Sequence, residues 1–106
     1  MGKIYFTLTG TKHYFGKEFL KSNMDIMLEK EPDNEYDNEA IQVKLEGLGK
    51  IGYVANSPYT VLGESMSAGR IYDKIGPHAK GKIILVTDCG VLCRLNKKSL
   101  KKEIED

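Results

Sequence analysis

The sequence has no tryptophan, only two cysteines and three prolines, and no long hydrophobic run. A membrane-spanning helix needs about 20 consecutive apolar residues, and no stretch of this chain approaches that length. The N-terminal run is too short and too polar for a signal peptide. We therefore expect a cytoplasmic protein of 106 residues with no membrane contact, and this length corresponds to about one domain.

An excess of charge of one sign is also missing. The 16 basic and 15 acidic residues leave a formal net charge of +1. This balance gives no general attraction to phosphate or to a membrane surface. Any contact with nucleic acid would therefore come from a local patch of residues.

The two cysteines, Cys89 and Cys93, are four residues apart. On one strand their Cα atoms would lie about 13 Å apart at ~3.3 Å per residue, which is too far for a disulfide. A zinc site needs about four ligands, and only His13 and His78 could add to the two thiols. The sequence therefore predicts two buried thiols, with no metal and no cofactor.

Alternation of apolar and polar residues predicts six β-strands. They cover residues 3–10, 23–30, 40–47, 50–54, 81–88 and 90–96. Pro32 ends the second strand because proline cannot donate to a ladder, and Gly47 and Gly49 predict a tight turn between the third and fourth. We expect one barrel domain at 1–96 and a charged tail at 97–106.

A helical segment is predicted between the fourth and fifth strands. Ser57 and Pro58 resemble a helix N-cap followed by proline at the first helical position, and the segment 59–75 contains Gly63 and Gly69 as interruptions. We expect one broken helix or two short helices, with an apolar face made of Val61, Leu62, Met66, Ile71 and Ile75. Short strands, glycine turns and one helical insert favour a small six-stranded antiparallel barrel of the oligonucleotide/oligosaccharide-binding (OB) type.

The acidic stretch EPDNEYDNEAIQV, residues 31–43, matches two metal-site patterns only in part. A calcium-binding EF-hand loop that began at Asp33 would need glycine at its sixth position and glutamate at its twelfth, where this chain has Asn38 and Lys44. Restriction-type nucleases carry a proline-aspartate pair and an acid-x-lysine triplet, which Pro32-Asp33 and Gln42-Val43-Lys44 imitate, but the metal needs carboxylate oxygens where Gln42 supplies an amide. We therefore predict no catalytic residue and no enzyme activity.

The same stretch resembles the HIRAN domain. The resemblance lies in Glu-Pro followed by Asp-Asn-x-Tyr-Asp-x-x-Ala-Ile-x-Val, in the Ile-Gly-Tyr of residues 51–53, and in the upstream basic-aromatic loop TKHYFG. It extends from about Ile4 to Leu95. The best-understood members of that family sit on eukaryotic fork-remodelling DNA translocases, where the domain is a modified OB barrel that holds the 3′ end of single-stranded DNA.

The resemblance implies a non-enzymatic module that binds a single-stranded DNA 3′ end in DNA repair or replication-fork processing. It points to six binding residues: Lys12, His13, Tyr36, Asp37, Tyr53 and Asn56. Tyr36 and Asp37 match the family directly. The other four stand where the family has arginine, an aromatic residue, histidine and lysine, in that order.

The chemistry of the tyrosine-aspartate pair fits an end-binding role. The ring of Tyr36 offers a face for a stacked base, worth about 1–3 kcal/mol. Asp37 would accept a hydrogen bond from a 3′-hydroxyl and repel a phosphate, and Lys12 would hold the next phosphate.

Alternative interpretations stay open at this point. Asp37 could brace a turn by bonding its amides, and His13 could be an ordinary surface residue. The whole domain could bind a protein partner, such as a helicase or a nuclease, or it could be a metal-dependent nuclease or other hydrolase.

Overall fold

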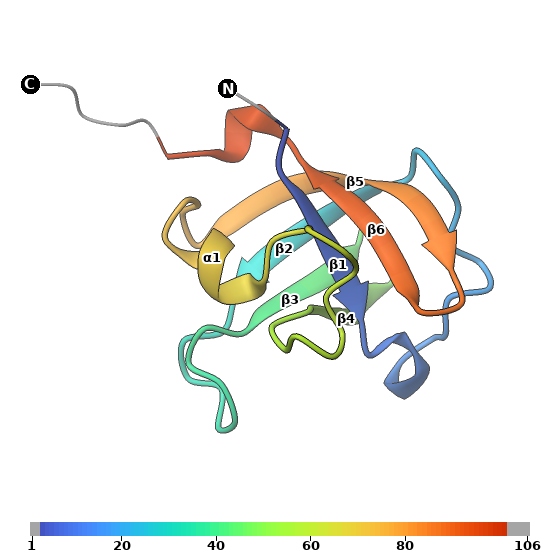
Figure 1. The fold of residues 1–106 in the computed structure, drawn as a ribbon, viewed down its shortest axis with the longest axis horizontal. Coiled ribbons are helices and arrows are strands. Elements are labelled where there is room, and N and C mark those ends of the chain that lie inside the picture. Colours follow the sequence, from blue (N-terminus) through green and yellow to red (C-terminus); the bar gives the residue numbers. More distant parts are fainter. Residues whose placement is uncertain (1–2, 102–106) are drawn as a thin grey trace, which may run out of the picture.

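The six predicted strands close into an antiparallel barrel in the computed structural model, which describes residues 3–101 (Figure 1). The strands are β1 (Tyr5–Thr9), β2 (Asp25–Lys30), β3 (Ile41–Leu45), β4 (Gly49–Val54), β5 (His78–Thr87) and β6 (Gly90–Leu95). Their order around the barrel is β1-β4-β3-β2-β5-β6, and β6 pairs back onto β1. Each described strand therefore has two neighbours, which leaves no open sheet edge.

The barrel interior follows the alternation of the sequence. Ile26 and Leu28 of β2 and Ile41 and Val43 of β3 are at most 1% exposed, and Leu45 packs against this core from its edge. Each large apolar side chain that is fully buried contributes about 1.5–3 kcal/mol. The predicted six-stranded, OB-like barrel is thereby confirmed.

The β3–β4 hairpin contains an irregularity that matters for the site. Val43 pairs with Gly52, whereas the next residue, Lys44, pairs with Lys50. Ile51 is thus an extra residue in β4, as in a β-bulge. Gly52 is required where the strands approach, because a Cβ there would lie 2.5 Å from the carbonyl oxygen of Thr9.

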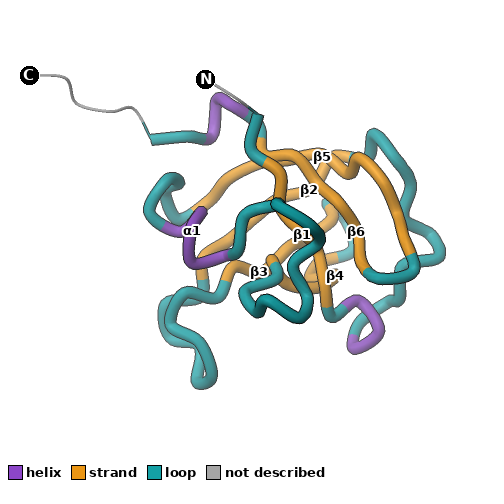
Figure 2. The backbone as a smooth tube through the Cα atoms, in the orientation of Figure 1, coloured by secondary structure: helices purple, strands orange, loops and turns teal. Residues whose placement is uncertain are grey.

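The predicted helical segment is mostly loop, and this expectation was wrong in extent. Only α1 (Ala68–Tyr72) is an α-helix, and its N-cap is Ser67, not Ser57. Residues 57–61 form a turn in which the amides of Thr60 and Val61 donate to the carbonyl oxygen of Ser57. Figure 2 shows how much of this connection is loop.

Contacts with β1 explain why the helix does not start earlier. The amide of Leu62 donates to Thr7 Oγ1 at 3.0 Å, and the amide of Met66 donates to the carbonyl oxygen of Tyr5 at 2.7 Å. These bonds hold the segment against the barrel in an irregular path. Of the predicted apolar face, Ile71 and Ile75 are fully buried, Met66 packs against the core, and Val61 and Leu62 are half-buried.

The cysteine prediction was half right. Cys93 is buried in β6, but Cys89 is exposed in the turn between β5 and β6. Asp88 and Cys89 form the surface turn between the two strands. The alternation of inward and outward side chains along a strand therefore does not extend to Cys89. Both thiols are free, and burial raises the pKa of the Cys93 thiol to about 12.

The charged tail predicted at 97–106 is described up to Lys101. It begins with a short 3-10 helix, η2 (Lys97–Ser99), and Leu100 then forms a β-bridge with Ile75. Residues 102–106 lie outside the described residues. Within the described part of the chain, no helix has the length and apolar character needed to cross a membrane.

Candidate functional site

The acidic loop between β2 and β3 projects from the lower end of the barrel in Figure 1. Asn34 organises it: its side-chain oxygen accepts hydrogen bonds from the amides of Tyr36 at 2.9 Å and Asp37 at 3.1 Å. Asparagine commonly stabilises turns in this way. A further backbone bond joins the amide of Ala40 to the carbonyl oxygen of Asp37, so the loop has a defined shape.

Four of the six predicted site residues line one hollow of about 390 Å³ beside this loop. Its walls are Asn34, Tyr36, Asp37, Ala40, Tyr53, Val54, Asn56, Ser57 and Thr60, and we refer to it as the Tyr36 hollow. The ring of Tyr36 is 92% exposed. Such exposure leaves both ring faces accessible to a ligand.

Asp37 braces the loop, as the turn interpretation expected. Its Oδ1 accepts from the amide of Glu39 and its Oδ2 accepts from Asn56 Nδ2, both at 2.9 Å. Asn56 in turn accepts from the amide of Gly69 in α1 at 2.8 Å. A carboxylate has about four acceptor positions, so each oxygen of Asp37 retains capacity for another donor.

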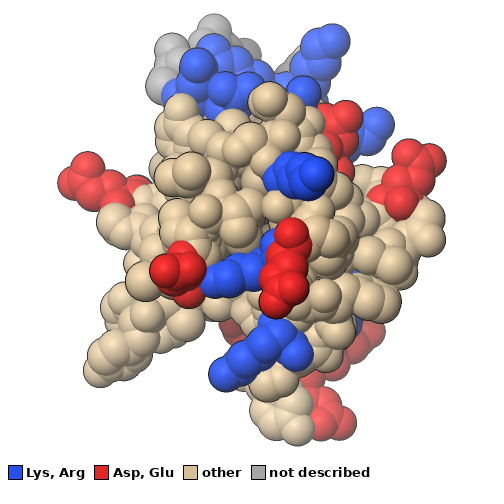
Figure 3. All heavy atoms as spheres, turned by 90° about the vertical axis from the view of Figure 1, so that its right-hand side faces the viewer, with Lys and Arg blue, Asp and Glu red and all other residues tan. Residues whose placement is uncertain are grey.

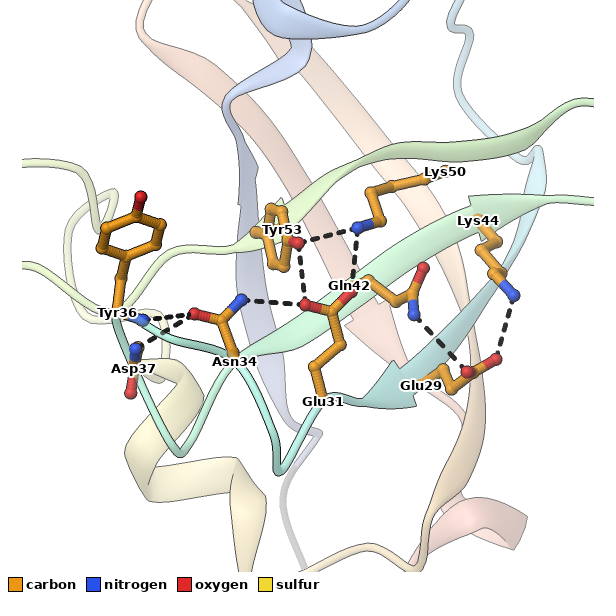
Figure 4. A network of polar contacts seen from close by, with 9 residues as sticks. All are labelled: Glu29, Glu31, Asn34, Tyr36, Asp37, Gln42, Lys44, Lys50 and Tyr53. Atoms are coloured by element: carbon orange, nitrogen blue, oxygen red, sulfur yellow. Dashed lines mark hydrogen bonds and ion pairs between the residues drawn. The ribbon is translucent and has the colours of Figure 1, made fainter.

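A second polar network lies behind the hollow and contains two residues that the sequence analysis did not identify, Glu31 and Lys50 (Figure 4). Glu31 Oε1 accepts from Tyr53 Oη at 2.8 Å and from Asn34 Nδ2 at 2.9 Å, and Glu31 Oε2 lies 2.9 Å from Lys50 Nζ. Lys50 Nζ also donates to Tyr53 Oη at 2.8 Å. Glu31 therefore links the barrel to the residue that shapes the loop.

The ionisation of this network follows from its contacts. Burial alone would raise the pKa of Glu31, but hydrogen bonds from Lys50, Asn34 and Tyr53 outweigh it and hold the pKa below its ordinary value. Burial likewise opposes the charge of Lys50, yet its bonds to Tyr53 and Glu31 raise the lysine's pKa. Burial raises the pKa of Tyr53. Near neutral pH, the network is a carboxylate-ammonium pair with a neutral phenol.

Lys12 and His13 lie on the neighbouring 3-10 turn η1 (Thr11–His13), and both are exposed. Neither lines the Tyr36 hollow. The next residue, Tyr14, connects this turn to the site, because its ring centroid lies 6.3 Å from that of Tyr53. The structure thus brings four predicted residues together and places the other two on the adjacent loop.

Comparison with known proteins assigns the fold and this loop to one family. The family model described as the HIRAN domain matches residues 1–75, which include β1 to β4, the acidic loop and α1. The chain belongs to the HIRAN-domain family.

Two solved structures share the HIRAN-domain barrel. The crystal structure of the HIRAN domain of human HLTF superposes with a TM-score of 0.58 at 16% identity, covering 89% of this chain and 74% of that one. A protein from Lactobacillus plantarum superposes with a TM-score of 0.54 at 23% identity, covering 89% of this chain and 96% of that one. No curated protein matches the sequence. At these identities the likeness establishes the fold.

The residues that imitated a nuclease motif have structural partners in this HIRAN domain. Gln42 Nε2 donates to Glu29 Oε2 at 3.4 Å, and Lys44 Nζ pairs with Glu29 Oε1 at 3.0 Å. Asp33 lies exposed in the acidic loop. Across residues 3–101, no three His, Cys, Asp or Glu side chains are grouped closely enough to hold a metal ion.

The sequence carried only a weak signal for the Glu31–Lys50 pair. Strand alternation would place Lys50 and Tyr53, three residues apart, on opposite faces of β4. The extra residue Ile51 reverses that parity, so both side chains reach Glu31. Glu31 itself was visible only as part of the Glu-Pro at the end of the second strand.

Proposed function

We propose that this HIRAN domain is a non-enzymatic module that binds single-stranded DNA at its 3′ end. The observation that supports it most is the placement of Tyr36, which is 92% exposed, beside Asp37 in one hollow. A stacking surface and a carboxylate at its side are the two groups that recognition of a terminal nucleoside needs. The family resemblance adds a role in DNA repair or replication-fork processing.

Recognition of the end would rest on Asp37. A 3′-hydroxyl donates a hydrogen bond, and the carboxylate has acceptor positions left after its bonds to Glu39 and Asn56. An internal or terminal phosphate in the same position would face the charge of Asp37 and the other carboxylates of the loop. The hollow would therefore favour a strand end that carries a hydroxyl over one that carries a phosphate.

Affinity would come from stacking and from a few phosphate contacts. A base on Tyr36 is worth about 1–3 kcal/mol. Lys12 and His13, on the adjacent turn η1, would contact the phosphate before the terminal nucleoside. Few phosphates would be neutralised at this site, and each contributes about −0.7 to the salt slope of single-strand binding.

A titration with three labelled oligonucleotides tests the proposal: one with a free 3′-hydroxyl, one with a 3′-phosphate, and one in which only the 5′ end is free. The parent should prefer the 3′-hydroxyl. Tyr36→Ala should weaken binding by about one stacked base, ~1–3 kcal/mol. Lys12→Ala should weaken all three strands alike, because phosphate contacts position a ligand without identifying it.

Asp37 needs two variants because it also braces the loop. Asp37→Ala should abolish the preference for the 3′-hydroxyl but also removes both intramolecular bonds. Asp37→Asn retains an oxygen for the amide of Glu39 and removes the charge. If Asp37→Asn has the parent's melting temperature and still prefers the 3′-hydroxyl, the charge of the carboxylate does not distinguish a 3′-hydroxyl from a 3′-phosphate. The proposed role of Asp37 in end recognition would then be refuted.

The alternative of a protein partner has one observation in its favour. Tyr36 and Tyr59 are 92% and 96% exposed, and tyrosine is enriched at protein interfaces. The same titration separates the two functions, since a protein-binding module would bind none of the three oligonucleotides with end preference.

A further inference from the structure

The end of the barrel away from the acidic loop carries a second hollow, of about 500 Å³. Lys3, Arg94, Leu95, Asn96, Lys97 and Lys98 line it, and we refer to it as the basic hollow. Four of these six residues are cations and none is acidic. In Figure 3, Lys and Arg side chains gather at the top of this face, and others lie at its middle and lower part; acidic side chains lie on its sides, middle and lower part and, at the upper right, just below the gathered cations.

The backbone that presents these cations is held in place. The amide of Asn96 donates to the carbonyl oxygen of Lys80 at 2.9 Å, and Ser99 Oγ accepts from the amide of Lys80 at 2.8 Å. The bridge from Leu100 to Ile75 fixes the other end of η2. Lys97 and Lys98 are therefore carried by a turn that is tied to β5.

The charge of the basic hollow is not cancelled within residues 3–101. Its four cations form no ion pair in that part of the chain. Of the carboxylates on the adjoining surfaces, Asp25 pairs with Lys82 at 3.5 Å, and Glu29 pairs with Lys44 at 3.0 Å. Glu64 lines a neighbouring hollow with Lys3, and Glu46 lines one with Asn96, but neither forms an ion pair with a cation of the basic hollow within residues 3–101. The hollow thus has a positive charge available for an external anion.

We propose that the basic hollow is a second contact surface for nucleic acid and binds its sugar-phosphate backbone. The identity of this polyanion rests on the proposed function. No aromatic side chain lines the hollow, so it offers no aromatic ring for a base, and its main contacts are those that lysine and arginine make with phosphate. The net charge of +1 conceals this patch because the acidic loop offsets it at the opposite end.

The positive charge of the basic hollow and the negative charge of the acidic loop lie at opposite ends of the barrel, so the two hollows would contact different parts of a DNA strand. A polyanion is attracted to the basic hollow, whereas the acidic loop repels every part of it except an end without phosphate. The shorter dimensions of the molecule are 31 and 30 Å. A strand joining the hollows would therefore need about nine nucleotides at the ~3.4 Å spacing that a strand has in B-DNA, and fewer where the single strand is more extended. Affinity should therefore rise with strand length while end preference stays constant.

Lysine-to-glutamine variants test the inference. Lys97→Gln, Lys98→Gln and the double variant remove exposed cations from η2, and Lys21→Gln is a matched control because it removes one exposed cation from the loop before β2. Binding is measured as a function of salt with labelled strands of about 4 and about 16 nucleotides, the range of OB-fold site sizes.

The double variant should lose two phosphate contacts, which makes the salt slope shallower by about 1.4. Between about 50 and 200 mM salt, the parent should then lose about sevenfold more affinity for the long strand than the double variant does. The strand of about 4 nucleotides with a free 3′-hydroxyl should bind both proteins alike. A variant without residues 103–106 removes three carboxylates from the sequence and should bind the long strand at least as tightly as the parent.

The outcomes separate this inference from the proposed function. The basic hollow is not a contact surface if the double variant keeps the parent's salt slope and affinity for the long strand. The same conclusion follows if Lys21→Gln lowers that affinity as much per removed charge as the η2 variants do. Neither result depends on whether the domain prefers a 3′-hydroxyl. If the slope falls as expected while no protein distinguishes a 3′-hydroxyl from a 3′-phosphate, the basic hollow is supported and the end-binding proposal fails.

Discussion

Removal of the Glu31 carboxylate should destabilise the domain and loosen the loop that carries Tyr36. Glu31→Ala leaves Lys50 Nζ, Tyr53 Oη and Asn34 Nδ2 without their common acceptor. The side chains of Glu31 and Lys50 are 18% and 29% exposed, so water can only partly replace the lost contacts. A hydrogen bond to a charged group contributes about 1.5–3 kcal/mol, and we expect a loss within that range.

The loss can be measured as a fall in the melting temperature. For a chain of this length, 1.5–3 kcal/mol corresponds to roughly 7–15 °C, followed by circular dichroism because the chain has no tryptophan. Glu35→Ala is the matched control, since Glu35 is an exposed carboxylate of the same loop, and it should change stability by less than about 0.5 kcal/mol.

A double-mutant cycle with Lys50→Met decides whether the two residues act together. Coupled residues show an interaction energy of about 0.5–3 kcal/mol, whereas independent ones add to within about 0.3–0.5 kcal/mol. Additive effects of Glu31→Ala and Lys50→Met would refute the network as a unit. If the two residues are coupled and their removal also weakens the preference for a 3′-hydroxyl, the network supports the shape of the loop that carries Tyr36 and Asp37.

The same carboxylate predicts how stability depends on pH. The pKa of Glu31 in the folded domain lies below its ordinary value of 4.5, so the pair stabilises the domain above that value and the contribution is lost as pH falls through the folded-state pKa. The stability difference between the parent and Glu31→Gln should therefore shrink below about pH 4.5. A difference that stays constant down to pH 3 would contradict this assignment.

Two further predictions concern the barrel. Gly52→Ala would place a Cβ 2.5 Å from the carbonyl oxygen of Thr9 and should lower the free energy of unfolding, measured in urea, by about 1–3 kcal/mol. Gly76→Ala is the control, because a Cβ at that position meets open space. Equal losses of stability in the two variants would contradict the close approach at Gly52. Burial and a pKa of about 12 protect Cys93, so an alkylating reagent near pH 8 should modify exposed Cys89 in the folded domain and both thiols after denaturation. Equal rates for the two thiols in the folded domain would contradict this.

The strands were predictable because apolar and polar residues alternate along most of their length, although Thr7 of β1 and Gln42 of β3 are buried between core residues. In β2 and β3, the alternating residues Ile26, Leu28, Ile41 and Val43 lie in the core and Leu45 packs against its edge, and burial of apolar surface fixes such a register strongly. The loop residues Tyr36 and Asp37 and the partners Tyr53 and Asn56 converge because they sit at or beside the same end of β3 and β4. Proximity within one hairpin is accessible to sequence reasoning.

Features that depend on contacts between distant segments were not predictable in the same way. The segment 57–67 has the local signals of a helix start, yet the amides of Leu62 and Met66 bond to β1 instead, and no local pattern reports that competition. The extra residue in β4 has one local signal, Gly52, since a glycine within a strand is typical of a close approach or a bulge; the signal does not say which residue is the extra one. Without it, Lys50 and Tyr53 would lie on opposite faces and Glu31 could not hold both.

The structural and binding roles of Asp37 reinforce each other. Its bonds to Glu39 and Asn56 fix the orientation of the carboxylate before any ligand arrives, so a 3′-hydroxyl would meet an acceptor that has already lost its freedom to rotate. Preorganisation of this kind lowers the entropic cost of binding. The brace therefore adds to the value of Asp37 as an acceptor. Asp37→Asn removes the charge and retains an acceptor for the amide of Glu39, so it is more informative than Asp37→Ala, which removes the charge and both bracing bonds.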